Sequence, residues 1–420
     1  MSEKTYICID LKCFYASVEC VDKGLDPFKS NLVVANPTRG RGGICLAISP
    51  ALKARGIKNR CRLFEIPTNI EYITAMPRMR RYMEVSAQIY SVYLKYIAPE
   101  DIHIYSIDEC FIDATPYIKL YNKTGKEFAK MLIDAVLKET GICAAAGIGT
   151  NLFLAKIALD ITAKKNDDHI GYLDERIFKK DVWFHQPLAD IWGIGRGISK
   201  RLAVYGIYDL HGITKIEEEV LYKEFGVNAE ILIDHAYGKE CCTMQDIKAF
   251  KPKSNSISNG QILFKDYNIN DAFIVLKEMI DVLTLELTDK KMVTQSVFLT
   301  IHYSKNIIPK TGGMKKLKNY TNAFSELCDA FEQLYFETTN PEYPIRKINV
   351  GFAHIIDQDL VTEQLTLFSE KSDNTKEKNL QKAVLKIKNK YGKNSILRGL
   401  SFQEQATAKQ RNQMIGGHHE

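Results

Sequence analysis

Acidic residues stand at the ends of two apolar runs that favour β-strands. The segment YSIDECFID, residues 105–113, holds Asp108 and Glu109 side by side and closes with Asp113. A second apolar run, TYICID, ends at Asp10. Acidic residues are depleted in strands. A pair held on a rigid, half-buried element therefore needs a compensating partner, and the obvious candidate is a cation.

The chemistry suggested by these carboxylates is metal-assisted phosphoryl transfer. Mg²⁺ prefers oxygen ligands and keeps substrate phosphates among them. Carboxylates on neighbouring strands can hold two metal ions about 3.5 to 4 Å apart, one activating the attacking oxygen and one stabilising the leaving oxygen. A solvated acidic pair in a turn is the competing interpretation, because such turns are common.

The hydrophobic pattern predicts the elements that position these acids. TYICID predicts a buried strand that ends at Asp10 and is followed by a helix. DIHIYSID and ECFID predict two strands around a tight turn, with Asp108 and Glu109 at or beside it. ICAAAGIGTNLFLAKIALDITAKKN predicts a strand that turns at Gly147 and Gly149 into a helix. Strands alternating with helices indicate an α/β or α+β layer.

The composition is that of an ordinary globular protein, with 45% hydrophobic and 26% charged residues. A length of 420 residues predicts two or three cores. No apolar run approaches the roughly 20 residues that cross a bilayer. The first ten residues lack the apolar core of a signal peptide, so a cytosolic protein is expected, with no membrane partner. The ten cysteines are scattered, without C-x-x-C spacing, and are expected to be reduced.

Basic residues gather in two places. Between Phe28 and Arg62 the chain has eight Lys and Arg residues and no Asp or Glu. Such a segment faces phosphate or simply faces water, and composition alone favours neither. Near the C-terminus, lysines recur every four residues and predict a helix with one basic stripe, at Lys378, Lys382, Lys386 and Lys390.

Two further modules are predicted downstream. The segment IWGIGRGISKRLAVYGIYDLHGI has short helical pieces separated by glycines, as in a helix-hairpin-helix whose turn presents backbone N–H groups to phosphate. A compact helical turn with glycine caps is the alternative interpretation. After a polar linker, residues 254–358 predict a β-α-β-β-α-β order, which is a split βαβ module.

Four segments together resemble the Y-family DNA polymerases, the low-fidelity translesion enzymes. They are YICIDLKCFYASVEC, YSIDECFID, GIGTNLFLAKIALDITAKK and WGIGRGISKRL. The resemblance covers nearly the whole chain in the expected order and is closest to the bacterial polymerase V type of SOS mutagenesis. It implies an α+β multidomain fold with a ferredoxin-like palm, small fingers, a helical thumb with the hairpin, and a β-α-β-β-α-β little finger.

The resemblance also implies domain boundaries. The expected parts are a palm over residues 1–21 and 75–170, fingers over 22–74, a thumb with the helix-hairpin-helix over 171–240, a linker over 241–253, a little finger over 254–358 and a C-terminal tail over 359–420. Fingers this short cannot form a large closing lid, so base-pair geometry would be checked loosely and damaged template tolerated. No segment is left for a proofreading exonuclease.

The acids match the family's catalytic site. Asp10, Asp108 and Glu109 match its metal-binding and catalytic carboxylates, which hold two Mg²⁺ ions with the backbone carbonyl of Leu11 as a further ligand. Asp108 would bridge both ions, and Glu109 would lie nearest the primer 3′-OH. Tyr15 matches the steric gate, an aromatic ring that would clash with a 2′-OH and so favour deoxyribonucleotides.

The triphosphate contacts implied by the resemblance depart from the family pattern. The family's fingers usually carry a tyrosine and, three residues later, an arginine, where this chain has Pro50 and Lys53. Lysine neutralises phosphate without the bidentate fork of arginine, and proline has no N–H to donate. Phe14 and Lys164 are the remaining nucleotide-binding residues that the resemblance implies. Arg55 or Arg41 is expected to compensate for the missing arginine.

The resemblance implies DNA and protein partners as well. Gly193, Gly195 and Lys200 of the hairpin would contact DNA. The peptide QLTLF resembles the short motif by which bacterial polymerases dock on the sliding clamp, through Gln364, Leu365, Leu367 and Phe368. A recombinase filament and an accessory subunit are further candidate partners.

The predicted function is that of an SOS-type translesion DNA polymerase, a nucleotidyltransferase that adds deoxynucleotides to a primer 3′-OH by two-metal chemistry without proofreading. Two alternatives stay open. Another palm-type nucleotidyl enzyme, such as a cyclase, would show no dependence on DNA. A catalytically weak or silent scaffold that binds DNA and the clamp would follow from lost triphosphate affinity at Pro50 and Lys53, although a silent protein has no need of all three acids.

Overall fold

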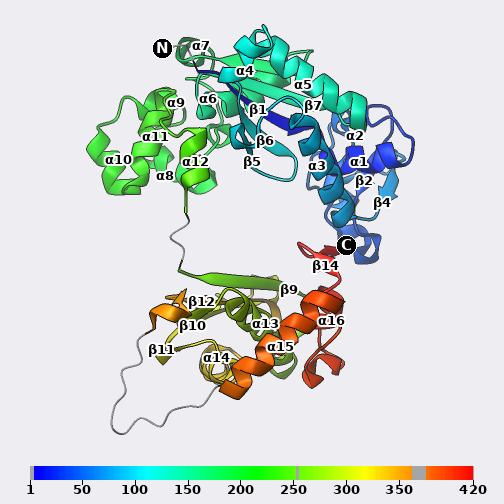
Figure 1. Ribbon diagram of the computed structural model, residues 1–420, viewed down its shortest axis with the longest axis vertical. Helices are drawn as coiled ribbons and strands as arrows, with labels where there is room; N and C mark the ends of the chain where they lie inside the picture. The colour runs from blue at the N-terminus through cyan, green and yellow to red at the C-terminus, as the bar shows by residue number, and fades with distance from the viewer. Residues whose placement is uncertain (1–3, 252–254, 362–374, 420) are drawn as a thin grey trace. The chain divides into compact units, whose positions relative to one another are not determined.

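The computed structural model describes residues 4–251, 255–361 and 375–419. The chain forms two compact units, Met1–Lys251 with His418–Glu420, and Pro252–Gly417 (Figure 1). The division falls inside the segment predicted as a linker, residues 241–253, although part of that segment is helical, α12 (Met244–Ala249). Among the described residues, no helix is both long and apolar enough to span a bilayer.

The first unit is built on a five-stranded sheet in the order β5-β6-β1-β7-β8. Its strands are β1 (Tyr6–Leu11), β5 (Ile102–Ile104), β6 (Glu109–Asp113), β7 (Ala144–Gly149) and β8 (Ile170–Leu173). Strand β1 lies at the centre and runs antiparallel to both β6 and β7, whereas β8 is parallel to β7. The strands predicted on either side of the acids are therefore confirmed, and they are neighbours in one sheet.

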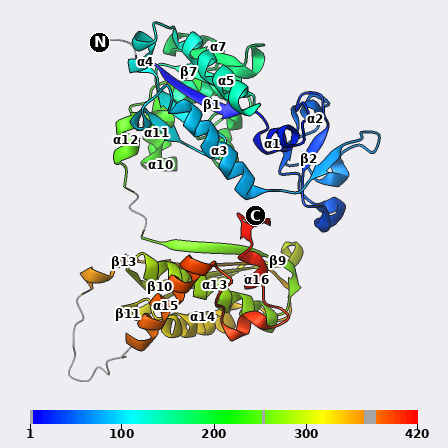
Figure 2. The same cartoon turned by 45° about the vertical axis from the view of Figure 1, so that its right-hand side comes forward.

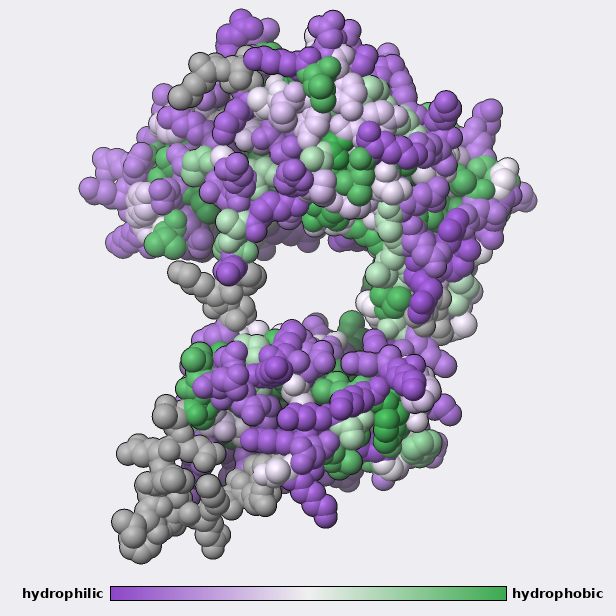
Figure 3. All heavy atoms as spheres, in the orientation of Figure 1, coloured by the Kyte–Doolittle hydropathy of each residue, from purple (hydrophilic) through white to green (hydrophobic). Residues whose placement is uncertain are grey.

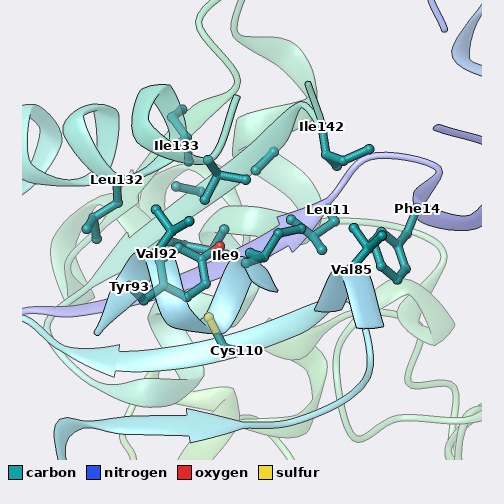
Figure 4. Packing of buried hydrophobic residues seen from close by; sticks show 14 of the residues in the cluster. Ile9, Leu11, Phe14, Val85, Val92, Tyr93, Cys110, Leu132, Ile133 and Ile142 are labelled. Atoms are coloured by element: carbon teal, nitrogen blue, oxygen red, sulfur yellow. The ribbon is translucent and has the colours of Figure 1, made fainter. Parts of the chain in front are cut away.

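Side chains alternate along β1 and enter two different cores. The helices around the sheet are α1 (Phe14–Asp22), α3 (Met79–Tyr93), α4 (Thr115–Leu120), α5 (Gly125–Thr140) and α6 (Leu152–Ile157). Ile9 packs with residues of α3 and α5, as Figure 4 shows. Cys8 packs on the opposite face with residues of α6. Asp10 has the same parity as Cys8, so it belongs to the α6 face.

Gly147 and Gly149 lie inside β7, so the prediction that the chain turns at these glycines is wrong. The turn comes afterwards, where Asn151 caps α6 by accepting a hydrogen bond from Leu154 N at 2.7 Å. The glycines instead allow α6 to lie directly on the strand. A Cβ on Gly149 would stand 2.2 Å from the backbone nitrogen of Ala155, closer than any side chain allows.

Two smaller assemblies complete the first unit. The segment predicted as fingers holds a three-stranded sheet in the order β3-β2-β4 and one α-helix. The strands are β2 (Leu32–Val34), β3 (Ala47–Ile48) and β4 (Ile73–Ala75), and the helix is α2 (Pro50–Ala54). The segment predicted as a thumb is helical, with α7 (Glu175–Asp181), α8 (Arg196–Val204), α9 (Leu210–Ile213), α10 (Glu218–Phe225) and α11 (Asn228–Ala236). Each assembly has a hydrophobic cluster, and that of the thumb segment includes residues of α6.

The second unit confirms the predicted β-α-β-β-α-β order (Figure 2). Its elements are β9 (Ile257–Tyr267), α13 (Ile269–Asp289), β10 (Met292–Tyr303), β11 (Thr311–Thr321), α14 (Phe324–Thr338) and β12 (Ile345–Ala353), with a short β13 (Ile356–Asp357). The sheet order is β11-β10-β12-β9. Its buried side chains pack with those of α13 and α14 in one core.

The C-terminal segment predicted as a tail, residues 359–420, is folded over much of its length. It contains α15 (Thr375–Tyr391), α16 (Ala408–Arg411), β14 (Met414–Ile415) and β15 (His418–His419). The predicted helix with a basic stripe is confirmed as α15, where hydrophilic side chains gather in Figure 3. Residues 375–417 belong to the second unit, so this part of the chain is no tail.

Buried polar contacts anchor this C-terminal segment, which explains why an apolar pattern did not reveal it. Gln381 of α15 donates to Thr288 Oγ1 at 2.9 Å and to the carbonyl of Asn322 at 3.0 Å. Glu278 of α13 is 3% exposed, and its Oε2 accepts from the backbone nitrogens of Thr407 at 2.8 Å and Ala408 at 2.9 Å. Single polar residues of this kind leave no periodic signal in a sequence.

Gly149→Ala should lower the free energy of unfolding by about 3 kcal/mol or more, because its Cβ would press on the backbone of α6. Gly197→Ala is the matched control, since Gly197 lies in α8 with nothing within 4 Å of an added Cβ, and alanine favours a helix there. Chemical denaturation of both variants checks this. Equal stabilities would contradict the close helix approach.

Glu278→Ala should also lower the free energy of unfolding by about 3 kcal/mol, because it leaves two buried backbone N–H groups without an acceptor. Glu286→Ala, on the same helix, removes only a half-exposed pair with Lys290 and should cost less than about 1 kcal/mol. The comparison again uses chemical denaturation. A smaller loss for Glu278→Ala than for Glu286→Ala would show that the C-terminal segment is anchored by other contacts.

Candidate active site

The three predicted acids meet at one end of the central sheet. Asp10 and Glu109 are directly opposite each other in the ladder between β1 and β6. Residues opposite in an antiparallel pair project their side chains from the same face. The backbone nitrogen of Leu11 donates to the carbonyl of Asp108 at 2.9 Å, which fixes Asp108 at the same strand end. The fold thus brings together residues that are nearly a hundred positions apart.

Asp10 carries the electrostatic strain of this arrangement. Burial raises the pKa of its carboxyl group to about 7, and the charges of Asp108 and Glu109 raise it in the same direction. A like charge nearby disfavours ionisation of a carboxyl group in the same way as loss of water does. A cation bound between these carboxylates would remove both penalties.

Lys156 is a functional candidate that the sequence interpretation missed. It projects from α6, is 7% exposed, and places its Nζ 2.7 Å from Glu109 Oε1 and 3.0 Å from Asp160 Oδ1. Burial lowers the pKa of Lys156, but the hydrogen bond to Glu109 and the charge of Asp160 outweigh it, so the net pKa is raised. A lone lysine inside the apolar run LFLAKIALD was the available signal, because a buried ammonium requires partners.

The carboxylates of this site fit a divalent cation whose remaining ligands are substrate phosphates and water. Among the described residues, no group of three His, Cys, Asp or Glu side chains could hold a metal ion by itself. Glu109 Oε1 is engaged by Lys156, and Asp108 Oδ1 accepts from Ser106 Oγ at 2.7 Å. Mg²⁺ is usually bound by one or two carboxylates together with substrate phosphates and water, and Asp10 and Asp108 supply such carboxylates.

Two aromatic residues, Phe14 and Tyr15, begin α1 shortly after the end of β1. Tyr15 stacks on Tyr82 of α3, with ring centroids 4.3 Å apart and planes 13° apart. Burial raises the pKa of Tyr15, and the charge of Asp108 adds to the effect. Phe14 is buried in the core, so its side chain cannot reach a nucleotide, and a contact there would have to come from its backbone.

Basic residues approach the acids from the fingers segment and from β1. Lys12 directly follows β1, and burial lowers its pKa; the nearby charge of Lys53 lowers it further, whereas that of Asp10 raises it. Lys53 is thus close enough to Lys12 for its charge to act on it, and Lys12 is a residue that the sequence interpretation missed. Arg55 and Lys164 are exposed, and in the described part of the chain they form no ion pair with the acids.

The predicted hairpin forms an open backbone turn. Gly193 has φ +86°, and Gly195 is the N-terminal cap of α8 with no side-chain cap. The first N–H groups of α8 therefore stay available to an anion. Lys200 is exposed on the same helix. Trp192 Nε1 donates to Tyr105 Oη at 3.1 Å, which ties the turn to the segment before Asp108.

The predicted clamp-binding peptide cannot be placed. Gln364, Leu365, Leu367 and Phe368 lie within residues 362–374, which are outside the described residues.

Comparisons with known proteins define the class and then the family. The Y-family DNA polymerase chimera Dbh-Dpo4(243-245)-Dbh superposes with a TM-score of 0.65 at 22% identity, covering 84% of this chain and 99% of that chain, so the fold is that of a Y-family polymerase. The pattern of the impB/mucB/samB family matches residues 9–160, and that of the family's C-terminal domain matches residues 254–367.

Relatives that align over nearly their full length support the same family assignment. The UV-damage repair protein UvrX of Bacillus subtilis is 32% identical over 99% of this chain and 97% of its own length, and DNA polymerase IV 2 of the same organism is 31% identical over 100% of both. The chain therefore belongs to the impB/mucB/samB family of Y-family translesion polymerases. The finer likeness to the polymerase V type stays a prediction, because these relatives are named UvrX and DNA polymerase IV.

Without metal, the folded protein should lose stability as the pH rises through the range that separates the ordinary pKa of Asp10, 3.8, from its folded value of about 7. In that range the folded state keeps a proton that the unfolded state has released, so the free energy of unfolding falls. Asp10→Asn should abolish this part of the fall and be more stable than the unaltered protein at neutral pH, by about 2 to 4 kcal/mol.

The measurement is chemical denaturation across this pH range in a metal chelator. The control is Asp134→Asn, on the exposed face of α5, which should keep the pH dependence of the unaltered protein. If the free energy of unfolding changed with pH in the same way in Asp10→Asn and in the unaltered protein, folding would not raise the pKa of Asp10.

Proposed function

We propose that this protein is a template-directed translesion DNA polymerase that extends a primer 3′-OH with deoxynucleotides. The observation that carries the proposal is the meeting of Asp10, Asp108 and Glu109 at one end of β1 and β6, in a chain that matches the family along nearly its whole length. Template and triphosphates are the substrates that this class of site uses. The reaction would proceed without proofreading.

The carboxylates and the lysines of the site have different proposed roles. Asp10 and Asp108 would hold the divalent metal, which we propose to be two Mg²⁺ ions that polarise the phosphate and the primer oxygen. The backbone carbonyl of Leu11 would add a ligand. Glu109 would lie nearest the primer 3′-OH. Lys12 and Lys53 would neutralise the triphosphate as point charges rather than by a bidentate fork.

Tyr15 supports selection of the sugar. Its ring stacks on Tyr82, and this contact would hold the ring beside a nucleotide bound at Asp108. A 2′-OH would meet this ring, and a deoxyribose would not. We therefore propose Tyr15 as the steric gate.

The remaining parts would bind DNA and partners. We assign the palm, fingers, thumb and little finger to the ranges given by the sequence, with residues 375–417 added to the last unit. The uncapped turn at Gly193 and Gly195, with Lys200 beside it, would hold the DNA backbone through phosphates alone, so binding should weaken steeply with salt.

The peptide from Gln364 to Phe368 would dock on the sliding clamp. A recombinase filament or an accessory subunit remains a candidate partner, and a cytosolic location is proposed.

The alternatives account for less of the molecule. A nucleotidyl cyclase would use the palm but leave the thumb segment and the β-α-β-β-α-β unit without a role. A silent scaffold would have no reason to keep three carboxylates together, because burial and the charges of its two neighbours raise the pKa of Asp10, which costs stability unless a metal is bound.

Asp108→Ala should reduce primer extension on undamaged template with Mg²⁺ by about a hundred-fold or more, because loss of a metal ligand removes several kcal/mol of transition-state stabilisation. Asp134→Ala, on the exposed face of α5, should extend like the unaltered protein. Gel-resolved extension of a labelled primer measures both. If the unaltered protein extends no primer while Asp108→Ala binds primer-template DNA equally well, the scaffold alternative replaces this proposal.

A further inference from the structure

Lys156 is a buried cation that the mechanism above does not use. Its side chain is 9% exposed and lies on the face of the sheet that carries Asp10. Its neighbours on α6, Ala155 and Ile157, are fully buried. Removing an ammonium group from water is costly unless nearby carboxylates compensate. Its position therefore calls for a reason beyond packing.

The contacts of Lys156 select one oxygen of Glu109. Glu109 Oε1 lies 2.7 Å from Lys156 Nζ and accepts from Cys8 Sγ at 3.2 Å. Glu109 Oε2 has no hydrogen-bond partner among the residues that the structure describes. One side of the carboxylate is thus fixed, and the other is left for a ligand.

Lys156 also reduces the charge of the site. Asp10, Asp108 and Glu109 stand together at the strand end, and Lys156 forms an ion pair with one of them, Glu109. Its charge favours ionisation of Asp10, opposite in direction to the effects of Asp108 and Glu109. The second partner, Asp160 at 3.0 Å, lies four residues further along the chain.

We propose that Lys156 is a positioning residue that fixes Glu109 through Oε1, leaves Oε2 for the reacting end, and serves as counter-ion of the acids before metal binds. The lysine touches neither the metal nor the substrate. The proposal deepens the function proposed above and rests on the metal site at Asp10 and Asp108.

The first test measures thermal unfolding of the full chain in a metal chelator. Lys156→Met keeps the length of the side chain and removes its charge, so the unpaired acids should lower the unfolding temperature by at least about 5 °C. Lys130→Met is the matched control, because Lys130 pairs with Asp134 at the same spacing of four residues but on the surface, and it should shift the temperature by less than about 2 °C.

Two additions separate this role from packing. In Lys156→Met with Glu109→Gln, no unpaired Glu109 charge remains, so the double variant should regain at least half of the lost temperature. Added Mg²⁺, without DNA or nucleotide, should raise the unfolding temperature of Lys156→Met more than that of the unaltered protein. A double variant no more stable than Lys156→Met, or an equal effect of Mg²⁺, would overturn the proposal. If Lys156→Met does not fold, the double variant still decides, because it folds only if charge was the cause.

The second test separates positioning from nucleotide binding. In single-nucleotide insertion, Lys156→Met should lower kcat by about ten-fold or more, with KM for the triphosphate changed by less than about three-fold, because misplacing Glu109 affects the reacting end only. A raised KM with unchanged kcat would show that Lys156 acts on the triphosphate instead. The unfolding measurements need no polymerase activity, so failure of the proposed function and failure of this inference are distinguishable.

Discussion

Repulsion among carboxylates in a half-buried place is the constraint on which the rest of the catalytic sheet depends. Asp10 and Glu109 face each other across a strand pair, and Asp108 is tied to the same end. Such a group is stable only if cations stand beside it. Lys156 supplies one from the helix side, and α6 can deliver it because Gly147 and Gly149 let that helix lie on the strand without an intervening side chain. The two glycines of β7 thus allow α6 to place Lys156 beside the carboxylates at the end of β1 and β6.

The opposite side of the site is built more loosely. The fingers segment holds a three-stranded sheet and one five-residue helix, and its lysine, Lys53, lies near Lys12 rather than in a fixed ion pair. In the role proposed for Lys12 and Lys53, two point charges would hold a triphosphate with less geometric demand than an arginine fork. The ring of Tyr15 stacks on Tyr82 of α3. A site with fixed acids and adaptable cations suits an enzyme that must accept irregular templates.

The second unit shows how a basic, polar segment becomes part of a fold. Residues 375–417 follow the stretch matched by the family pattern, which ends at 367, and they are held by buried polar contacts at Gln381 and Glu278. The peptide predicted to bind the clamp consequently stands between two folded segments of the chain, not at a free end.

The sequence by itself determined the local elements and the identity of the acids. Apolar runs ending at Asp10 and Asp108, and the β-α-β-β-α-β order, are carried by short-range periodicity that one chain displays. Tertiary structure alone decided which oxygen of Glu109 is engaged, that Lys156 and Lys12 join the site, that Phe14 is core, and that the glycines of β7 receive a helix. These features depend on contacts between residues distant in sequence, and such contacts leave no periodic pattern to read.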